Sequence, residues 1–199
     1  MYQVHVRETP GHPRRAVAFA LVMICLATGA AALFVRLQRS GQPGNRLHPP
    51  DWSVSFVPPA GWVRLTVDAR AAGAEPVCFY EPARGAKPSV LCVSRVRVWG
   101  ARSAQRICHD AIASFFPDRL GRAATIALLR RVEYEEAFLG PLDGVRAVLA
   151  DTGTIFVVGV AGTTPLGTEA YVLEYHRDGA LEPHDLTVCD RVARSFQRR

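Results

Sequence analysis

TIFVVGVAGTTPLGTEAYVLEYH, residues 154–176, decides the fold of this chain. Residues 154–160 form a continuous apolar run, which is typical of a strand covered on both faces. Residues 163–167 have the composition of a turn, and residues 169–176 return as a second extended segment. A short turn of this kind joins antiparallel strands, so the stretch predicts a mostly antiparallel sheet.

The segments before this hairpin carry strand patterns in two groups. Strands are expected at residues 52–56, 62–67, 77–80 and 90–99, and again at 132–138 and 145–150, with a turn at 141–144. In the segment 132–138, Val132, Tyr134 and Phe138 are expected on one strand face, with Glu133 and Glu135 on the other.

Apolar residues at helical spacing predict the remaining elements. One helix is expected at residues 103–116, ended by Pro117, with a short helix at 123–130. A last helix takes Pro183 near its first turn and has an apolar stripe that ends at Phe196. The order of four strands, a helix, four strands and a helix indicates an α+β domain, a mostly antiparallel sheet packed with helices.

AVAFALVMICLATGAAALFV, residues 16–35, contains neither a charge nor a proline. An α-helix of about 20 apolar residues spans the roughly 30 Å hydrocarbon core of a bilayer. We therefore expect a short cytoplasmic N-terminus at 1–15, a transmembrane helix at 16–35, a Gly- and Pro-rich linker at 36–50 and an extracytoplasmic domain at 51–199. A cleaved signal peptide is the alternative, with residues 30–32 as its small-residue site, but the apolar run continues past that site.

The net charge of +6 divides unevenly along the chain. Residues 1–46 carry six arginines and one acid, whereas residues 47–199 carry 18 basic and 17 acidic residues. The domain is therefore nearly neutral, and the basic residues flank the apolar segment, where long side chains reach lipid headgroups. Among the 24 basic residues Lys87 is the single lysine, which indicates codon bias rather than a phosphate-binding design, and we expect no nucleic-acid partner.

The apolar segment has a face of small residues. Ala27, Thr28, Ala31 and Ala32 share it at i, i+4 spacing. Such faces let two transmembrane helices approach closely, so we expect an integral membrane protein complex as a partner in the bilayer. The general abundance of alanine in this chain is the simpler explanation.

Four cysteines lie in the domain, and four cysteines allow three pairings. Cys78 and Cys92 lie on the two arms of one predicted hairpin, so a cross-strand disulfide is expected. Cys108 and Cys189 lie on the apolar stripes of two helices and can pair only if both helices cover the same sheet face. Four buried free thiols are the alternative. A disulfide favours an extracytoplasmic domain, whereas the arginines on both sides of the apolar segment leave its orientation open.

The sequence contains no nucleophile elbow, phosphate-binding loop or zinc-protease motif. We expect no enzyme activity, no cofactor and, without a CxxC pair, no metal site. Glu133 and Glu135 are interpreted as a solvated strand face. Arg95, Arg97 and Trp99 share one strand face and are the candidate ligand or partner surface; cation–π packing on a solvated face is the simpler interpretation.

WSVSFVPPAGW, residues 52–62, resembles the opening of PsbP-like domains, the family of the extrinsic photosystem II protein and its bacterial relatives. The matching positions are Phe56, Pro59, Gly61 and Trp62. The end of the chain is similar too: LDG at 142–144 precedes a strand and a long hairpin, and a helix closes on VARSF at 192–196. The resemblance implies an antiparallel sheet packed with helices and a non-catalytic accessory role at a membrane complex. The membrane anchor departs from the soluble lumenal members, and residues for the family's metal and chloride functions are not identifiable here.

Together these observations predict a single-pass protein of the bacterial cytoplasmic membrane. Its extracytoplasmic domain is expected to be a non-catalytic subunit, or an assembly or stabilising factor, of a larger membrane complex, photosynthetic or respiratory. The alternative is an envelope module that binds a lipid or another small molecule in an apolar pocket lined by residues such as Phe79, Trp99 and Tyr171. A third hypothesis is an enzyme whose polar groups converge from distant strands.

Overall fold

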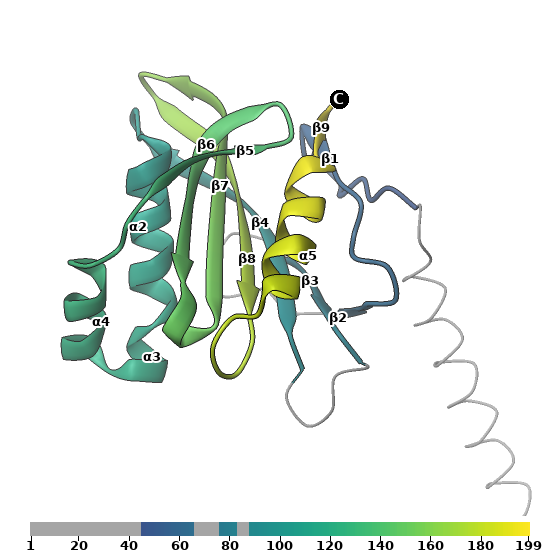
Figure 1. Ribbon diagram of the computed structural model, residues 1–199. Helices are drawn as coiled ribbons and strands as arrows, with labels where there is room; N and C mark the ends of the chain where they lie inside the picture. The colour runs from purple at the N-terminus through teal and green to yellow at the C-terminus, as the bar shows by residue number, and fades with distance from the viewer. Residues whose placement is uncertain (1–44, 66–75, 83–87) are drawn as a thin grey trace, which may run out of the picture. The chain divides into compact units, whose positions relative to one another are not determined.

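The computed structural model describes residues 45–65, 76–82 and 88–199. Within these residues the chain forms a seven-stranded antiparallel sheet in the order β2-β3-β4-β8-β7-β6-β5 (Figure 1). Its strands are β2 (Val63–Leu65), β3 (Val77–Tyr80), β4 (Val90–Trp99), β5 (Glu135–Leu139), β6 (Leu142–Leu149), β7 (Thr154–Thr164) and β8 (Gly167–His176). The predicted α+β class and the antiparallel sheet are confirmed.

Helices cover both faces of this sheet. One face carries α2 (Ala104–Phe115), α3 (Pro117–Leu120) and α4 (Arg122–Leu129), and the other carries α5 (Pro183–Arg194) (Figure 1). Two strands, β1 (Val54–Ser55) and β9 (Gln197–Arg198), form a small antiparallel ribbon on the α5 side. Two hydrophobic cores result, one under α5 that contains Phe56 and Tyr171, the other under α2 that contains Ile112 and Phe156.

The central hairpin of β7 and β8 is where the sequence placed it. Its register runs from Thr154 opposite His176 to Thr164 opposite Gly167, with an irregularity between Val160 and Gly162. The strands extend further than the apolar run, and the turn is correspondingly shorter than residues 163–167. Polar pairs continue the ladder beyond the core because backbone hydrogen bonds do not need buried side chains. The hairpin therefore protrudes beyond the helices that cover the sheet.

The turn between β5 and β6 corrects the expectation at residues 141–144. Leu139 pairs with Leu142, so the turn consists of Gly140 and Pro141, and Leu142 is already in the strand. Gly140 has φ 59, as the first position of a type II′ hairpin turn requires. Phe138 is also placed differently: it is 64% exposed instead of sharing a packed face with Val132 and Tyr134.

Helix α2 begins after Ser103, whose side chain accepts a hydrogen bond from the backbone N–H of Arg106. Pro117 ends α2, as predicted, and at the same time starts the short helix α3, where its missing N–H is tolerated. A capping box formed by Glu182 and Asp185 fixes the start of α5.

The cysteines are now assigned. Cys78 and Cys92 are opposite each other in the β3–β4 register and form the predicted disulfide. Cys108 and Cys189 are both buried and free, because α2 and α5 cover opposite sheet faces. The second candidate disulfide is therefore excluded. Burial raises the pKa of the Cys108 thiol to about 12, which leaves it protonated and unreactive at neutral pH.

The predicted transmembrane helix at 16–35, with its small-residue face of Ala27, Thr28, Ala31 and Ala32, lies outside the described residues. Across the part of the chain that the structure describes, none of the helices has both the length and the apolar character needed to cross a bilayer. Near the start of that part, Leu47 pairs with Phe56, so contact with the domain begins within the predicted linker.

Candidate functional site

The surface residues predicted from the sequence lie together at one end of the sheet. In β4, Leu91 and Val93 face the core under α5, and Arg95, Arg97 and Trp99 continue the same face beyond it. Trp99 lies opposite Gly167, next to the turn of the β7–β8 hairpin, and Gly100, with φ 74, ends the strand there. Trp99 is 88% exposed, since no helix covers this part of the sheet.

A hollow of about 530 Å³ lies at this place, and we call it the hairpin groove. Its main side chains come from β4, the β7–β8 turn and β8. They are Arg97, Trp99, Leu166 and Glu169. Leu166, at the tip of the hairpin, is 78% exposed, so two large apolar side chains flank the groove. Single exposed apolar side chains are common on protein surfaces, but these two line the same hollow.

The polar groups of the groove form a chain of contacts. The Arg97 Nε atom lies 3.4 Å from the Glu169 Oε2 atom, and the Tyr171 hydroxyl donates to Glu169 Oε1 over 2.9 Å. Tyr171 in turn accepts a hydrogen bond from the backbone N–H of Ser53. Burial is the main reason that the pKa of Tyr171 is raised. Arg95 donates to the backbone carbonyl of Asp51. These bonds attach the groove to the segment that precedes β1.

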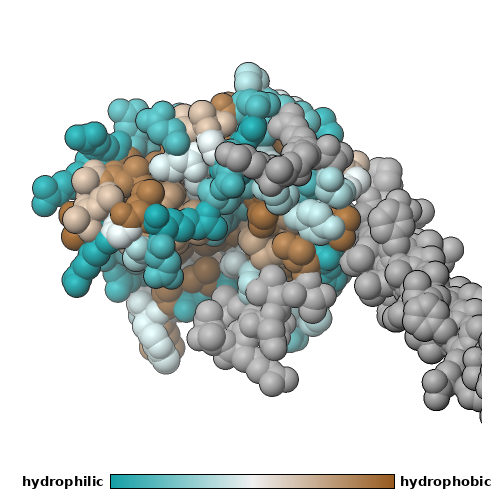
Figure 2. All heavy atoms as spheres, turned by 90° about the horizontal axis from the view of Figure 1, so that it is seen from below, coloured by the Kyte–Doolittle hydropathy of each residue, from teal (hydrophilic) through white to brown (hydrophobic). Residues whose placement is uncertain are grey.

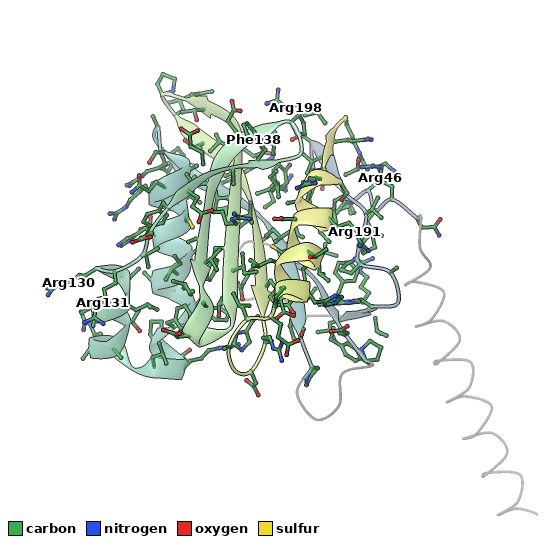
Figure 3. The ribbon with its side chains drawn as sticks, viewed as in Figure 1. Arg46, Arg130, Arg131, Phe138, Arg191 and Arg198 are labelled. Carbon is green, nitrogen blue, oxygen red and sulfur yellow. A yellow bond between two sulfur atoms is a disulfide. The ribbon has the colours of Figure 1, made fainter. Side chains whose placement is uncertain are left out.

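A second hollow, of about 570 Å³, lies where the β5–β6 turn meets the end of α5. We call it the C-terminal pocket; it is lined by Phe138, Gly140, Pro141, Arg194, Phe196, Gln197 and Arg198. The sequence did not single out this site. The sequence signal that could have identified it is the Gly140–Pro141 pair, which predicts a two-residue turn. Such a turn pairs Leu139 with Leu142 on the core face, so Phe138 lies on the opposite face of the edge strand β5 and is exposed. Figure 3 shows Phe138 and Arg198 at the same end of the molecule, with Arg46 close to the C-terminal part of α5.

The opposite end of the molecule is different in character. Figure 2 views that end and shows hydrophobic residues on the side of α3 and α4, interspersed with hydrophilic ones. Leu120 of α3 and Ile126 of α4 are only partly exposed, at 43% and 46%. The most exposed large apolar side chains of the described residues are therefore those of the hairpin groove and the C-terminal pocket.

Glu135 of β5 belongs to an ion-pair network. Glu135 accepts from Arg146 over 2.7 Å, and Arg146 also contacts Asp190 of α5 over 3.1 Å. The hydrogen bond from Glu135 is the main reason that the pKa of Arg146 is raised. These contacts join β5, β6 and α5. Among the described residues, no group of three or more His, Cys, Asp or Glu side chains is arranged to hold a metal ion.

Glu174 is a titratable residue that the sequence analysis missed. It lies between Cys92 and Phe156 in the sheet, on the α2 side. Burial raises its pKa to about 7, and the nearby Arg119 guanidinium opposes this only in part. The sequence signal that could have identified Glu174 is an acidic residue at an inward-facing position of the otherwise largely apolar strand β8. His176, on the same strand face, bonds Thr154 through its Nδ1 atom, and burial lowers its pKa.

The expected apolar ligand pocket is not formed by the residues named for it. Phe79 and Tyr171 are fully buried in the core under α5, whereas Trp99 is on the outer surface. Their side chains pack against neighbours such as Phe56 and Trp52 instead of lining a shared cavity.

No protein-family model matches the chain, and no curated protein matches it. The chain is similar to a crystal structure from Bacteroides thetaiotaomicron, with 13% identity and a TM-score of 0.41 over 79% of this chain and 49% of the other. It is also similar to LpqN, involved in cell envelope biogenesis of Mycobacterium tuberculosis, with 15% identity and a TM-score of 0.40 over 77% and 88% of the two chains. This chain spans about half the length of the Bacteroides structure. Likenesses at this level do not identify a family.

Proposed function

We propose that this chain is a single-pass protein of the bacterial cytoplasmic membrane whose extracytoplasmic domain binds a protein partner. It acts as a non-catalytic subunit, or an assembly or stabilising factor, of a membrane complex. The observation that carries the proposal is the hairpin groove, where Trp99 is 88% exposed beside Arg97 and Leu166. Trp and Arg are the residues that most often dominate the energy of protein–protein interfaces.

The groove has the composition of an interface centre. Its apolar part, Trp99 and Leu166, supplies area that a partner can remove from water. The Arg97–Glu169 pair supplies both signs of charge at its edge, where they select a partner more than they add affinity. The Cys78–Cys92 disulfide supports an oxidising compartment for the domain.

A PsbP-like sandwich is the family proposal that goes with this role. The two sequence motifs behind it meet in space: Phe56, of the opening motif, stacks on Phe196, of the closing motif, with ring centroids 5.1 Å apart. Trp62 is buried, and Gly61 has φ 80, which favours glycine at that turn. These contacts support a structural role for the shared residues.

The test is native purification of the full chain in mild detergent, with Trp99→Ala as the variant. Wild type is expected to co-purify with an integral membrane partner at a fixed ratio, and Trp99→Ala to weaken that association at least about tenfold. Because Trp99 is exposed, the variant should unfold at the same temperature as wild type. Ile126→Ala, at the other end of the molecule, is the control and should leave the association unchanged. A wild-type monomer without a partner, or equal co-purification of Trp99→Ala, would overturn the proposal.

A further inference from the structure

We infer that the C-terminal pocket binds the phosphate of anionic phospholipid headgroups and thereby docks the domain on the surface of its own membrane. This inference rests on the proposed membrane anchoring of residues 16–35. It concerns a surface separate from the hairpin groove, and its ligand is lipid rather than protein.

The first argument is the chemistry of the pocket. Arg194 and Arg198 both line it, and both are exposed. Among the described residues neither guanidinium group has a carboxylate partner; Arg198 has one long contact, 3.5 Å, to the backbone carbonyl of Ala161. Two guanidinium groups at one hollow match the oxygens of a phosphate, which accept paired hydrogen bonds.

The second argument is the apolar rim. Phe138 is 64% exposed and lines the pocket together with Pro141. An aromatic side chain beside cationic groups is the composition of a surface that rests at the boundary between headgroups and acyl chains. Asp143, opposite Phe138 in the register, and Glu136, two residues before Phe138, are the acidic groups on this strand face. The four arginines Arg46, Arg194, Arg198 and Arg199 outnumber these two acidic residues at this end of the domain.

The third argument is where the chain enters the domain. Arg46 donates from Nη1 to the backbone carbonyl of Ser195 over 2.7 Å, at the end of α5 that carries the pocket (Figure 3). Residues 36–44 separate the apolar segment from the described domain, and nine extended residues reach about 30 Å. Anchoring of residues 16–35 therefore tethers the domain, and the pocket with it, to a bilayer. Such tethering gives even a weak headgroup contact a high effective concentration.

The backbone around the pocket is built to hold its shape. The N–H of Gly140 donates to the carbonyl of Ala193 over 2.7 Å, which attaches the β5–β6 turn to α5. Ser195 donates to the carbonyl of Val192 over 2.7 Å and accepts from the N–H of Val57 over 2.9 Å. The two arginines are thus presented from a fixed helix end and ribbon.

The experiment measures hydrogen exchange of the full chain in lipid nanodiscs, comparing phosphatidylcholine alone with a mixture containing phosphatidylglycerol. Anionic lipid is expected to slow exchange of peptides covering residues 136–144 and 193–198 at least about threefold, and high salt should reverse this. The double variant Arg194→Gln/Arg198→Gln should lose the protection. Arg130→Gln/Arg131→Gln removes the same charge from the end of α4, away from the pocket in Figure 3, and should keep it.

Equal exchange in both lipid mixtures would overturn the inference. Protection that appears only when a protein partner is added would also overturn it and would assign the pocket to that partner. Extraction of the chain from the bilayer by alkaline carbonate would instead refute the anchoring on which the proposed function depends. The two failures are therefore distinguishable.

Discussion

Gly140 lies directly against the last turn of α5: its N–H donates to the carbonyl of Ala193, and a Cβ atom at Gly140 would lie 2.1 Å from the carbonyl oxygen of Phe196. That oxygen belongs to backbone and cannot move aside as a flexible side chain would. The φ of Gly140 is also positive, at 59. The contact between the β5–β6 turn and α5 therefore requires glycine at this position.

Gly140→Ala should destabilise the domain by at least about 2 kcal/mol, since it combines a strained φ with a backbone overlap. Gly121→Ala is the control without an overlap: Gly121 has φ 79 and ψ 159 but open space around its Cβ position, so backbone strain of about 1–3 kcal/mol acts there alone, and its loss should be smaller than that of Gly140→Ala. Chemical denaturation of both variants measures the difference. Equal losses would contradict a tight fit between the turn and α5.

Asp185 is expected to contribute to stability through its hydrogen bonds. Its side chain is fully buried, and it accepts from the Tyr175 hydroxyl over 2.6 Å and from Arg177 over 2.9 Å. Burial alone would raise its pKa, but these bonds and that from the N–H of Glu182 outweigh burial and lower it. A carboxyl whose pKa is lower in the folded state stabilises the fold above its unfolded pKa, and this contribution is lost as pH falls through the folded value.

Asp185→Asn should therefore lose about 3 kcal/mol at pH 7 and show a weaker decline of stability in acid than wild type does. Asp151→Asn, at an exposed position, should change neither. Urea denaturation between pH 3 and pH 7 measures both effects. An unchanged acid profile for Asp185→Asn would show that this carboxyl does not control acid stability.

Glu174 should have the opposite pH dependence. Its pKa is about 7 in the folded protein and 4.5 as a free group, because burial disfavours the charged form. The folded state therefore holds the proton more tightly, and stability falls as pH rises from about 4.5 to about 7. Glu174→Gln, which resembles the protonated form, should stabilise the domain by about 1–3 kcal/mol at pH 8 and very little at pH 4.5.

Thermal unfolding at these two pH values tests Glu174→Gln, and Glu133→Gln is the exposed control. The pKa of His176 is lowered in the folded protein, so the stability that His176 contributes is lost as pH falls. This pH dependence is opposite to that of Glu174. It is present in both proteins and cancels in the comparison. A variant that is less stable than wild type at pH 8 would contradict a half-buried Glu174 with a raised pKa.

The Cys78–Cys92 disulfide closes a short loop, with a sequence separation of 14. Loops of this length constrain the unfolded chain by about 3 kcal/mol. The double variant Cys78→Ser/Cys92→Ser should therefore unfold at a temperature several degrees lower than wild type. The control Cys108→Ser/Cys189→Ser should leave the response of stability to reductant unchanged, because both residues are free thiols. Titration of native and denatured protein with a thiol reagent provides the second measurement; four reactive domain thiols without reductant would exclude the disulfide.

The sequence predicted those elements whose side chains repeat at the period of one structure. β3 and β4 are at the predicted residues, and α2 differs from its prediction by one residue at each end. Ser103, Pro117 and the apolar stripe are local signals, so tertiary contacts did not need to override them. The Arg95, Arg97 and Trp99 surface was equally readable, because strand alternation places all three on one face.

The parts that the sequence missed depend on distant contacts. Whether Cys108 could meet Cys189 depended on which sheet faces α2 and α5 cover, and no local pattern carries that information. The contact of the Gly140 turn with the end of α5 likewise joins residues more than fifty positions apart in the chain.

By itself, then, the sequence determined the α+β class, the central β7–β8 hairpin, the Cys78–Cys92 disulfide between the paired strands β3 and β4, and one candidate surface. Each of these follows from side chains close in the chain or from a simple period. Only the tertiary structure decided that the arginines of α5 and β9 join the β5–β6 turn at one pocket, and that the carboxyl of Glu174 is half-buried with a raised pKa. Packing two helical layers on opposite faces of one sheet brings such residues together or removes them from water, and that packing is a property of the whole domain.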